Sequence, residues 1–309
     1  MRFGARVDEF DIHDGRVIAV RAGPERIEAG PVILAIGHSA RDTIRRLVAC
    51  GVRITAKPFQ IGLRIEHPQA LVNGWQYGSC ASHPRLPPAE YHLVAGGAAA
   101  DRGNVFSFCM CPGGRVLPCN ESTGQVVTNG ASGSRRGGPF ANSALVVTFD
   151  PREISEDPLA GVAFQERWER RAFEMTRGTY KVPAHRASDF RAGRPSDGRL
   201  DVSYPLGGEW VDVRGVVPVF VADAIARALE LFDSRMPGFG GPDAVLMGPE
   251  TRASSPVRIA RDATTRESIS TRNLYPVGEG SGYTGGIVSA AVDGLRTAEA
   301  LIARYAPAG

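Results

Sequence analysis

The sequence predicts an α/β protein in which one domain, made of a β-meander, parallel strands and a C-terminal helix, is interrupted by an inserted domain of mixed α+β structure. Three observations support this prediction: strand patterns at the N-terminal end, a strand-rich middle with two helices, and a strand, a glycine-rich loop and a helix at the C-terminal end. The expected boundaries are residues 1–54 and 271–309 for the interrupted domain and residues 55–270 for the insertion.

The N-terminal part is expected to form a β-meander of three strands, over residues 2–12, 16–20 and 26–36, with turns at glycines between them. The third strand ends in the apolar run 32–36. Such a run is typical of a strand that is buried on both faces of a parallel sheet.

A short helix is expected after Gly37 ends this strand. Ser39 or Asp42 is the predicted cap, because a side-chain oxygen at that place accepts from the first free N–H groups. The predicted buried stripe is Ile44, Leu47 and Val48. Gly51 then ends the helix.

The middle of the chain reads as short strands between residues 54 and 150, followed by two helices. One helix is expected at 159–175. The other begins near Pro218 and carries apolar residues at helical spacing, namely Val217, Phe220, Val221, Ala224, Ile225, Ala228, Leu229 and Phe232. Residues 187–212 between them are expected to form a loop.

The composition is that of a folded globular protein: of 309 residues, 43% are hydrophobic and 22% are charged, and this length allows two domains. The net charge of +3 and the lack of a long Lys/Arg run disfavour nucleic acid as a partner. No apolar stretch approaches the roughly 20 residues of a membrane helix, so no membrane partner is expected. Asp8 and Glu9 stand where a signal peptide would be apolar, which predicts a cytoplasmic location.

The five cysteines are odd in number, which fits free thiols in a reducing compartment better than a disulfide framework. Cys109 and Cys111 are close enough in sequence to act as a redox pair or to bind a metal. They lack the second pair and the histidine typical of zinc sites, so no metal is expected. We keep both thiols as catalytic candidates.

The C-terminal end carries a strand at 273–277, the glycine-rich loop 278–286 and a helix. The predicted apolar face of this helix is Ile287, Val288, Ala291, Val292, Leu295, Ala298, Leu301 and Ile302. A strand that delivers glycines to a helix start presents free N–H groups and the positive helix end to an anionic ligand. The alternative is a tight strand-to-helix packing turn, because the loop is not a Walker loop.

The segment LYPVGEGSGYTGGIVSAAVDGL resembles the C-terminal flavin motif of two-dinucleotide-binding-domain flavoproteins. The resemblance implies that Glu279 lies near the ribityl and pyrophosphate groups of FAD, and that the helix start faces the flavin pyrimidine carbonyl. The implied cofactor-binding residues are Ala35, Gly37, Gly278, Glu279, Gly280, Gly285, Gly286 and Ile287. Reduced flavin is negative near N1 and C2=O, where a helix dipole stabilises it.

Longer motifs, including IGHSARDT, KPFQIGLRIEHPQ, FSFCMCPGG, AGRPS and ETRASSPVRI, resemble the bacterial uncharacterised FAD-dependent dehydrogenases over nearly the whole chain. This resemblance implies an incomplete FAD-binding Rossmann-like domain with an inserted substrate domain. It also implies an oxidoreductase that transfers hydride between flavin and an unknown small-molecule or protein redox substrate, with NAD(P)H as a candidate electron donor. Arg252 and Arg258 are substrate-side candidates, although arginines in loops are commonly paired with Asp or Glu.

Members of that family carry a segment with a G-x-G-x-x-G loop upstream of the meander, and this sequence has no such loop there. We therefore expect an incomplete gene product or fragment, and the rival hypothesis is a remnant that binds no cofactor. A remote alternative is a serine hydrolase, because Ser39 follows an apolar strand as in a nucleophile elbow. Arg41 occupies the place where that elbow needs a small residue, and nothing in the sequence ties His185 to Ser39.

Overall fold

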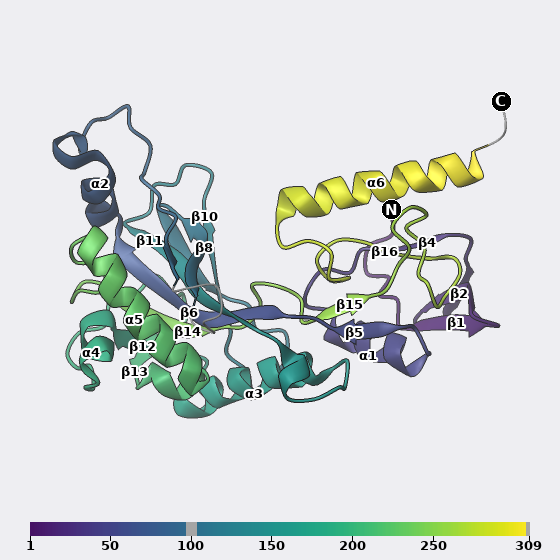
Figure 1. The fold of residues 1–309 in the computed structure, drawn as a ribbon, viewed down its shortest axis with the longest axis horizontal. Helices are drawn as coiled ribbons and strands as arrows, with labels where there is room; N and C mark the ends of the chain where they lie inside the picture. Colours follow the sequence, from purple (N-terminus) through teal and green to yellow (C-terminus); the bar gives the residue numbers. More distant parts are fainter. Residues whose placement is uncertain (97–103, 307–309) are drawn as a thin grey trace. The chain divides into compact units, whose positions relative to one another are not determined.

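The computed structural model describes residues 1–96 and 104–306, and the chain divides into two compact units (Figure 1). Unit 1 consists of Met1–Phe59, Asp150–Ala163 and Ser254–Gly309, and unit 2 of Gln60–Phe149 and Phe164–Ala253. Unit 2 is therefore inserted into unit 1 in two pieces.

The predicted β-meander is present in unit 1. Strands β1 (Glu9–His13), β2 (Arg16–Ala22) and β3 (Glu25–Glu28) pair antiparallel in the order β1-β2-β3. The expected third strand is divided, however, because β4 (Val32–Leu34) belongs to another sheet. Pro31 has no N–H to continue a ladder between the two pieces.

Strand β4 pairs parallel with β16 (Leu274–Pro276), and the N–H of Val277 extends this ladder to the carbonyl of Leu34 at 3.0 Å. The parallel pairing agrees with the sequence prediction. The expectation of burial on both faces is wrong, because the Ile33 side chain of β4 is 49% exposed.

Helix α1 (Arg41–Ala49) buries Ile44 and Leu47 as predicted, but its predicted cap is wrong. Its N-cap residue is Ala40, and no side chain of the described residues caps it. Ser39 lies one position too early, and Asp42 lies inside the helix, where its carboxylate contacts the Arg6 guanidinium.

The rest of unit 1 comprises the antiparallel pair β5 (Ile54–Ala56) and β15 (Val257–Ile259), the short helix η2 (Pro151–Glu153) and helix α6 (Ile287–Tyr305). Its hydrophobic core combines all three pieces of the unit, and its buried members are Phe10, Val17, Leu34, Ile44, Leu47, Val52, Ile54, Val162, Val257, Ile259 and Leu274.

Unit 2 is built on a seven-stranded mixed sheet with the order β13-β12-β14-β6-β11-β8-β7. The strands are β6 (Phe59–Pro68), β7 (Val94–Ala95), β8 (Val105–Cys111), β11 (Phe140–Phe149), β12 (Val182–Arg186), β13 (Gly208–Trp210) and β14 (Val245–Glu250). A hairpin of β9 (Gly114–Pro118) and β10 (Thr128–Ser132) accompanies it. The protein is therefore a mixed α/β protein, with β12 and β13 parallel in this sheet.

The two predicted long helices are present as α3 (Ala160–Met175) and α5 (Val219–Arg235). Pro218 directly precedes α5, and the buried residues of α5 are Val221, Ala222, Ala224, Ile225, Ala228, Leu229 and Phe232. The sequence did not predict α2 (Gln69–Tyr77) and η1 (Gly78–Cys80). The expected loop 187–212 is wrong in two places, because it contains α4 (Ala187–Ala192) and β13, and η3 (Val213–Val216) follows it.

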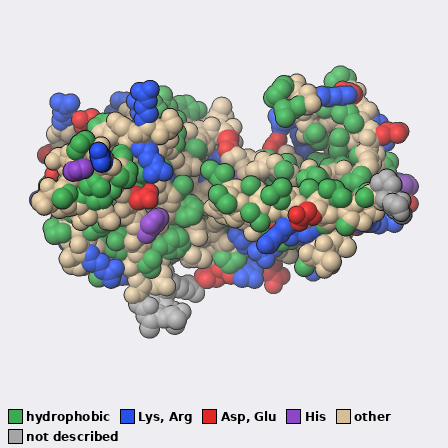
Figure 2. All heavy atoms as spheres, turned by 90° about the horizontal axis from the view of Figure 1, so that it is seen from above, with side chains coloured by type: hydrophobic (Ala, Val, Ile, Leu, Met, Phe, Trp, Pro, Cys, Tyr) green, Lys and Arg blue, Asp and Glu red, His purple; other side chains and the backbone are tan. Residues whose placement is uncertain are grey.

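The apolar face of α6 is exposed, contrary to the packing that its pattern predicts. Ile287, Val288, Val292, Leu295 and Ile302 are all exposed, and Ile287 reaches 92%. Figure 2 views the molecule from the side of α6 and shows hydrophobic side chains along this helix. The residues that α6 buries are instead Asp293 and Thr297. Among the described residues, no helix is long and apolar enough to cross a membrane.

Candidate functional site

The glycine-rich loop lies directly against the end of β4. A Cβ atom at Gly280 would lie 1.9 Å from the carbonyl oxygen of Gly37, so the two backbones are in contact. Beside them, Nδ1 of His38 lies 3.4 Å from Oε1 of Glu279. The structure therefore brings together two segments that are more than two hundred positions apart in the sequence.

Two glycines of this loop have a conformation that other residues rarely adopt, with φ of +76° at Gly278 and +82° at Gly282. At Gly282, a Cβ atom would also lie 2.2 Å from the carbonyl oxygen of Val257. The loop thus needs glycine at these positions for its own shape.

Asp293 of α6 binds the first residue of the glycine-rich loop, Gly278. Its carboxylate accepts from the N–H of Gly278 at 2.9 Å, from both terminal nitrogens of Arg261 at 2.9 and 2.6 Å, and from Arg266. Burial opposes the charged form, but the hydrogen bonds from Arg261 and Gly278 outweigh it and hold the Asp293 pKa well below its usual range. Sequence reasoning missed Asp293, although it is the acidic residue within the small and apolar SAAVDGL segment.

The start of α6 is accessible. Its N-cap residue is Gly286, no side chain of the described residues caps it, and Gly285, Gly286 and Ile287 are exposed. The first N–H groups of a helix have no partner within the helix, and they carry its positive dipole end. This helix end can therefore receive an anionic group.

Three buried polar atoms around the loop have no hydrogen-bond partner among the described residues: Nε2 of His38, Oγ of Ser281 and Oγ1 of Thr284. Buried polar groups are nearly always hydrogen-bonded, so three such atoms in one place fit a polar molecule at this site. Sequence reasoning did not identify these residues. Their signal is that they stand within or beside the two glycine-containing segments.

Positive charge flanks Glu279. Lys57 donates to the carbonyl of Ser255 at 3.3 Å, and its pKa is lowered by burial and by the charge of Arg258, against the attraction of Glu279. The Arg258 guanidinium donates to the carbonyl of Gly282 at 3.3 Å. Of the two predicted substrate-side arginines, Arg258 therefore lies at the glycine-rich loop.

The other predicted arginine, Arg252, belongs to unit 2. Its guanidinium pairs with Glu169 at 3.1 Å and also contacts Glu121. Ala35 lies exposed in unit 1, between β4 and Gly37. The structure thus groups most of the predicted cofactor residues and Arg258, but it does not bring Arg252 into the same unit.

Unit 2 contains a buried ion pair that the sequence did not predict. Arg64 of β6 is completely buried and binds both carboxylate oxygens of Glu250 at 3.0 and 2.8 Å. It also donates to Oδ1 of Asn142 at 2.8 Å, and Thr128 donates to Glu250 at 3.2 Å. The available signal was a charged residue within the otherwise apolar strand IGLRI.

Cys109 and Cys111 belong to β8, and Cys109 contacts this ion pair. The β8–β11 ladder is irregular there, Cys109 has φ of +50° and is exposed, and its carbonyl accepts from Arg64 at 3.4 Å. Cys111 is buried, and its thiol donates to the Cys109 carbonyl at 3.3 Å. Its hydrogen bond to Cys109 and its burial raise the Cys111 pKa, so its thiol stays protonated at neutral pH.

None of the five cysteines, all of which lie in the described residues, forms a disulfide bond. Within residues 1–96 and 104–306, no group of three His, Cys, Asp or Glu side chains could hold a metal ion. Ser39 is exposed in unit 1, whereas His185 belongs to unit 2, where Nε2 lies 2.9 Å from the carbonyl of Arg194. The hydrolase alternative stays an untested prediction.

Glu66, the second residue after Arg64 on β6, is a buried acid with a shifted pKa. It accepts from the N–H of Ser203 at 2.9 Å and from the Ser203 hydroxyl. Burial raises the Glu66 pKa to about 7, and the bonds from Ser203 only partly oppose this shift.

Replacing Glu66 with glutamine is therefore expected to remove a pH dependence of stability. The folded pKa of about 7 lies above the ordinary value of 4.5, so the stability that protonated Glu66 contributes is present below pH 4.5 and is lost as the pH rises through 7. Between pH values well below 4.5 and well above 7, Glu66 changes the free energy of unfolding by roughly 3 kcal/mol at most. His67, whose pKa burial lowers to about 4, is present in both proteins and cancels.

Urea unfolding at several pH values between about 4.5 and 8 measures this effect. All three tryptophans, Trp75, Trp168 and Trp210, belong to unit 2, so their fluorescence reports this unit. The variant should gain stability relative to the natural protein as the pH rises. A stability difference that does not change with pH would contradict the prediction.

Comparison with known proteins gives two findings. Residues 58–253 match the family described as "FAD-dependent protein, C-terminal domain-like". The chain is also 41% identical over 308 residues to an uncharacterized protein of Clostridium beijerinckii. That alignment covers 99% of this chain and 57% of the relative, so the chain spans little more than half of the relative's length.

Proposed function

The chain belongs to the FAD-dependent protein family whose C-terminal domain matches residues 58–253, and from this premise we propose that it is part of a flavoprotein oxidoreductase. The observation that carries the proposal is the contact between Gly37, three residues after β4, and Gly280 of the glycine-rich loop. This contact joins the glycine-rich loop, which resembles a flavin motif, to the segment IGHSARDT, which resembles FAD-dependent dehydrogenases. We infer that unit 1 is an incomplete Rossmann-like domain for FAD.

The residues around the loop fit FAD chemically. Helix α6 begins at the exposed Ile287, directly after the exposed Gly285 and Gly286. The positive end of this helix would lie against the pyrimidine edge of the flavin. Lys57 and Arg258 supply positive charge for a pyrophosphate, since guanidinium and ammonium groups make strong bonds to phosphate.

The unpartnered polar atoms around the loop, together with Glu279, also fit FAD as the ligand. His38, Ser281 and Thr284 offer buried nitrogen and hydroxyl groups to a molecule rich in hydroxyls and amides. We assign Glu279, which is partly exposed beside His38, to the ribityl and pyrophosphate region. Bound flavin would supply hydride transfer, and the protein would supply orientation and electrostatics.

We propose that unit 2 presents the substrate, a small molecule or a redox protein, with NAD(P)H as a candidate electron donor. The match to the family's C-terminal domain covers the whole inserted unit, together with residues 58–59 and 150–163 of unit 1. Within it, the exposed Cys109 lies beside the buried charge of Arg64 and is the thiol best placed to react.

We further propose that tight FAD binding uses polypeptide equivalent to the part of the Clostridium beijerinckii protein that the alignment leaves uncovered. The exposed apolar face of α6, with Ile287, Val288 and Leu295, and the exposed Ile33 of β4 provide a surface for such a segment. An apolar stripe of this length on a helix is normally buried against another element.

Spectroscopy with added FAD tests the proposal directly. The purified chain, alone and together with the uncovered part of the relative expressed separately, is titrated with FAD, and the flavin absorbance and fluorescence of the bound fraction are measured. Saturable binding in either case supports a flavin site. If neither preparation binds FAD, the rival hypothesis of a cofactor-free remnant is favoured.

Replacing Gly286 with leucine is expected to weaken FAD binding by about tenfold or more, which corresponds to one lost hydrogen bond to a charged group. The leucine side chain would occupy the space in front of the first turn of α6. The fold should tolerate it, because Gly286 has extended backbone and a Cβ atom there would meet Oγ of Ser289 at an ordinary 3.7 Å.

The matched control is Gly133→Leu in unit 2, an exposed glycine whose added Cβ atom would meet nothing within 4 Å among the described residues. Both variants should keep the circular dichroism spectrum and the melting temperature of the natural protein. Unchanged FAD affinity in Gly286→Leu would count against the assigned site.

A further inference from the structure

A cavity lies wholly within unit 2, between α3 and the segment that joins η3 to α5. Its volume is about 460 Å³, in the range of small-molecule sites. The residues that line it are Arg167, Trp168, Arg170, Arg171, Glu174, Arg214, Gly215, Val217 and Val219. None of the residues assigned above to FAD belongs to this set.

The cavity is strongly positive. Arg167, Arg170, Arg171 and Glu174 follow one another at the spacing of a single helix face, so three guanidinium groups share that face with one carboxylate. Glu174 lies 3.9 Å from Arg171, in an exposed pair that stabilises little. Repulsion between the guanidinium groups would be relieved by an anion in the cavity.

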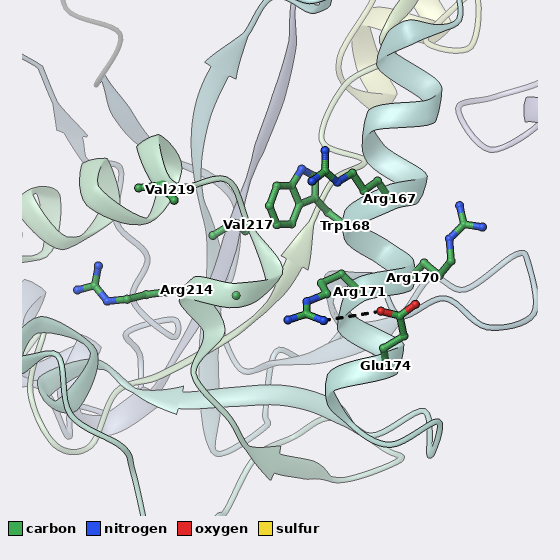
Figure 3. Close-up of a pocket in the computed structure, with 9 residues that line it drawn as sticks. Arg167, Trp168, Arg170, Arg171, Glu174, Arg214, Val217 and Val219 are labelled. Atoms are coloured by element: carbon green, nitrogen blue, oxygen red, sulfur yellow. Dashed lines mark ion pairs between the residues drawn. The ribbon is translucent and has the colours of Figure 1, made fainter.

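The arginines differ in direction. In Figure 3, Arg167 and Arg171 extend from α3 toward the side of Val217, whereas the guanidinium groups of Arg170 and Arg214 point away from the space between the two segments. Arg214 is also engaged elsewhere, 3.6 Å from Asp223 and with its guanidinium carbon 4.3 Å from the centre of the Phe190 ring. Arg167 and Arg171 are therefore the two cations available to a ligand.

The same cavity offers a flat apolar surface. The guanidinium of Arg167 lies over the indole ring of Trp168, 5.5 Å from its centre, and Val217 and Val219 form part of the opposite wall. The Nε1–H of Trp168 is buried and has no partner among the described residues. A buried indole N–H normally finds an acceptor, and here a ligand could provide one.

We propose that this cavity binds a small molecule in which a flat ring carries an anionic group, either a phosphate or a carboxylate. The guanidinium groups of Arg167 and Arg171 bind the anion, because their planar fork matches both kinds of oxygen acceptor. The ring packs against Trp168 and the valines, and an acceptor atom of the ligand takes the indole N–H. This site is independent of the flavin site and goes beyond the proposed function.

Calorimetric titration of the full chain with four probes tests the proposal. 1-Naphthyl phosphate and 1-naphthoate carry both the ring and a negative charge, whereas 1-naphthol lacks the charge and inorganic phosphate lacks the ring. At least one naphthyl anion should bind about tenfold more tightly than naphthol and inorganic phosphate, and the preferred anion identifies the phosphate or the carboxylate source. Equal affinity for inorganic phosphate, or no binding of either naphthyl anion, would overturn the proposal.

Variants locate the binding. The double variant Arg167→Gln, Arg171→Gln should lose about tenfold or more in affinity for the preferred naphthyl anion, and raised salt should weaken binding to the natural protein. Arg199→Gln is the matched control, because Arg199 is an exposed arginine of unit 2 outside the cavity. Trp168→Phe should also weaken binding while keeping an aromatic ring. Unchanged affinity in the double variant would refute the assignment even if a probe binds.

Discussion

Replacing Arg64 with methionine is expected to lower the free energy of unfolding of unit 2 by about 3–5 kcal/mol. The change leaves the carboxylate of Glu250, which is buried and held by two bonds from Arg64, without its countercharge. It also removes the donor to Asn142. An unpaired buried charge destabilises more than the pair itself stabilises, because its desolvation is no longer compensated.

Urea unfolding followed by tryptophan fluorescence measures this loss, since the tryptophans belong to unit 2. The double variant Arg64→Met, Glu250→Leu should recover most of the stability, because it removes both charges together. Arg199→Met is the control: its side chain is 88% exposed and 3.8 Å from Asp201, so its loss should stay below about 0.5 kcal/mol. If Arg64→Met loses no more stability than the Arg199→Met control, the ion pair is not buried as described.

Replacing Gly280 with alanine is expected to separate the glycine-rich loop from the end of β4. The added Cβ atom would lie 1.9 Å from the oxygen and 2.6 Å from the carbon of the Gly37 carbonyl, and neither atom belongs to a side chain that could rotate away. Overpacking against backbone should destabilise unit 1 by about 3 kcal/mol. FAD binding, if it uses this contact, should fall below detection.

Amide hydrogen exchange provides the measurement for unit 1. The N–H of Val277, which donates to the carbonyl of Leu34, reports the ladder between β16 and β4 and should exchange faster in Gly280→Ala. Gly285→Ala is the matched control, because no described atom lies within 4 Å of a Cβ atom there and its φ is not in the left-handed region. Equal protection of Val277 in Gly280→Ala and the natural protein would contradict the predicted loop displacement.

Much of the local structure could be predicted from the sequence. The meander, α3, α5, β16 and α6 follow from apolar periodicity and from glycines at their ends, which are properties of neighbouring residues. A parallel arrangement of the strand at 32–36 was also expected, from its apolar run, but its pairing with β16 was not predicted. The misplaced cap of α1 and the missed α4 concern a single position and a six-residue helix, where local signals are weakest.

The candidate site was predicted only in part. The glycine-rich loop and Glu279 carry a recognisable spacing, whereas Asp293 and the unpartnered His38 and Ser281 become meaningful only when distant segments meet. Arg252 and Arg258 look alike in the sequence. In the structure, Arg258 lies at the loop and Arg252 is held by Glu169.

The sequence by itself determined the N-terminal meander, the glycine-rich loop before the last helix and the two long helices of the insertion, because each depends on residues that are close together in the chain. Only the tertiary structure decided that Arg64 meets Glu250, 186 positions away, and that α6 turns Asp293 inward and its apolar face outward. The physical reason is that a helix pattern defines two faces, but hydrogen bonds from Arg261 and Gly278 to Asp293 select the face that packs. Periodicity carries no record of such distant partners.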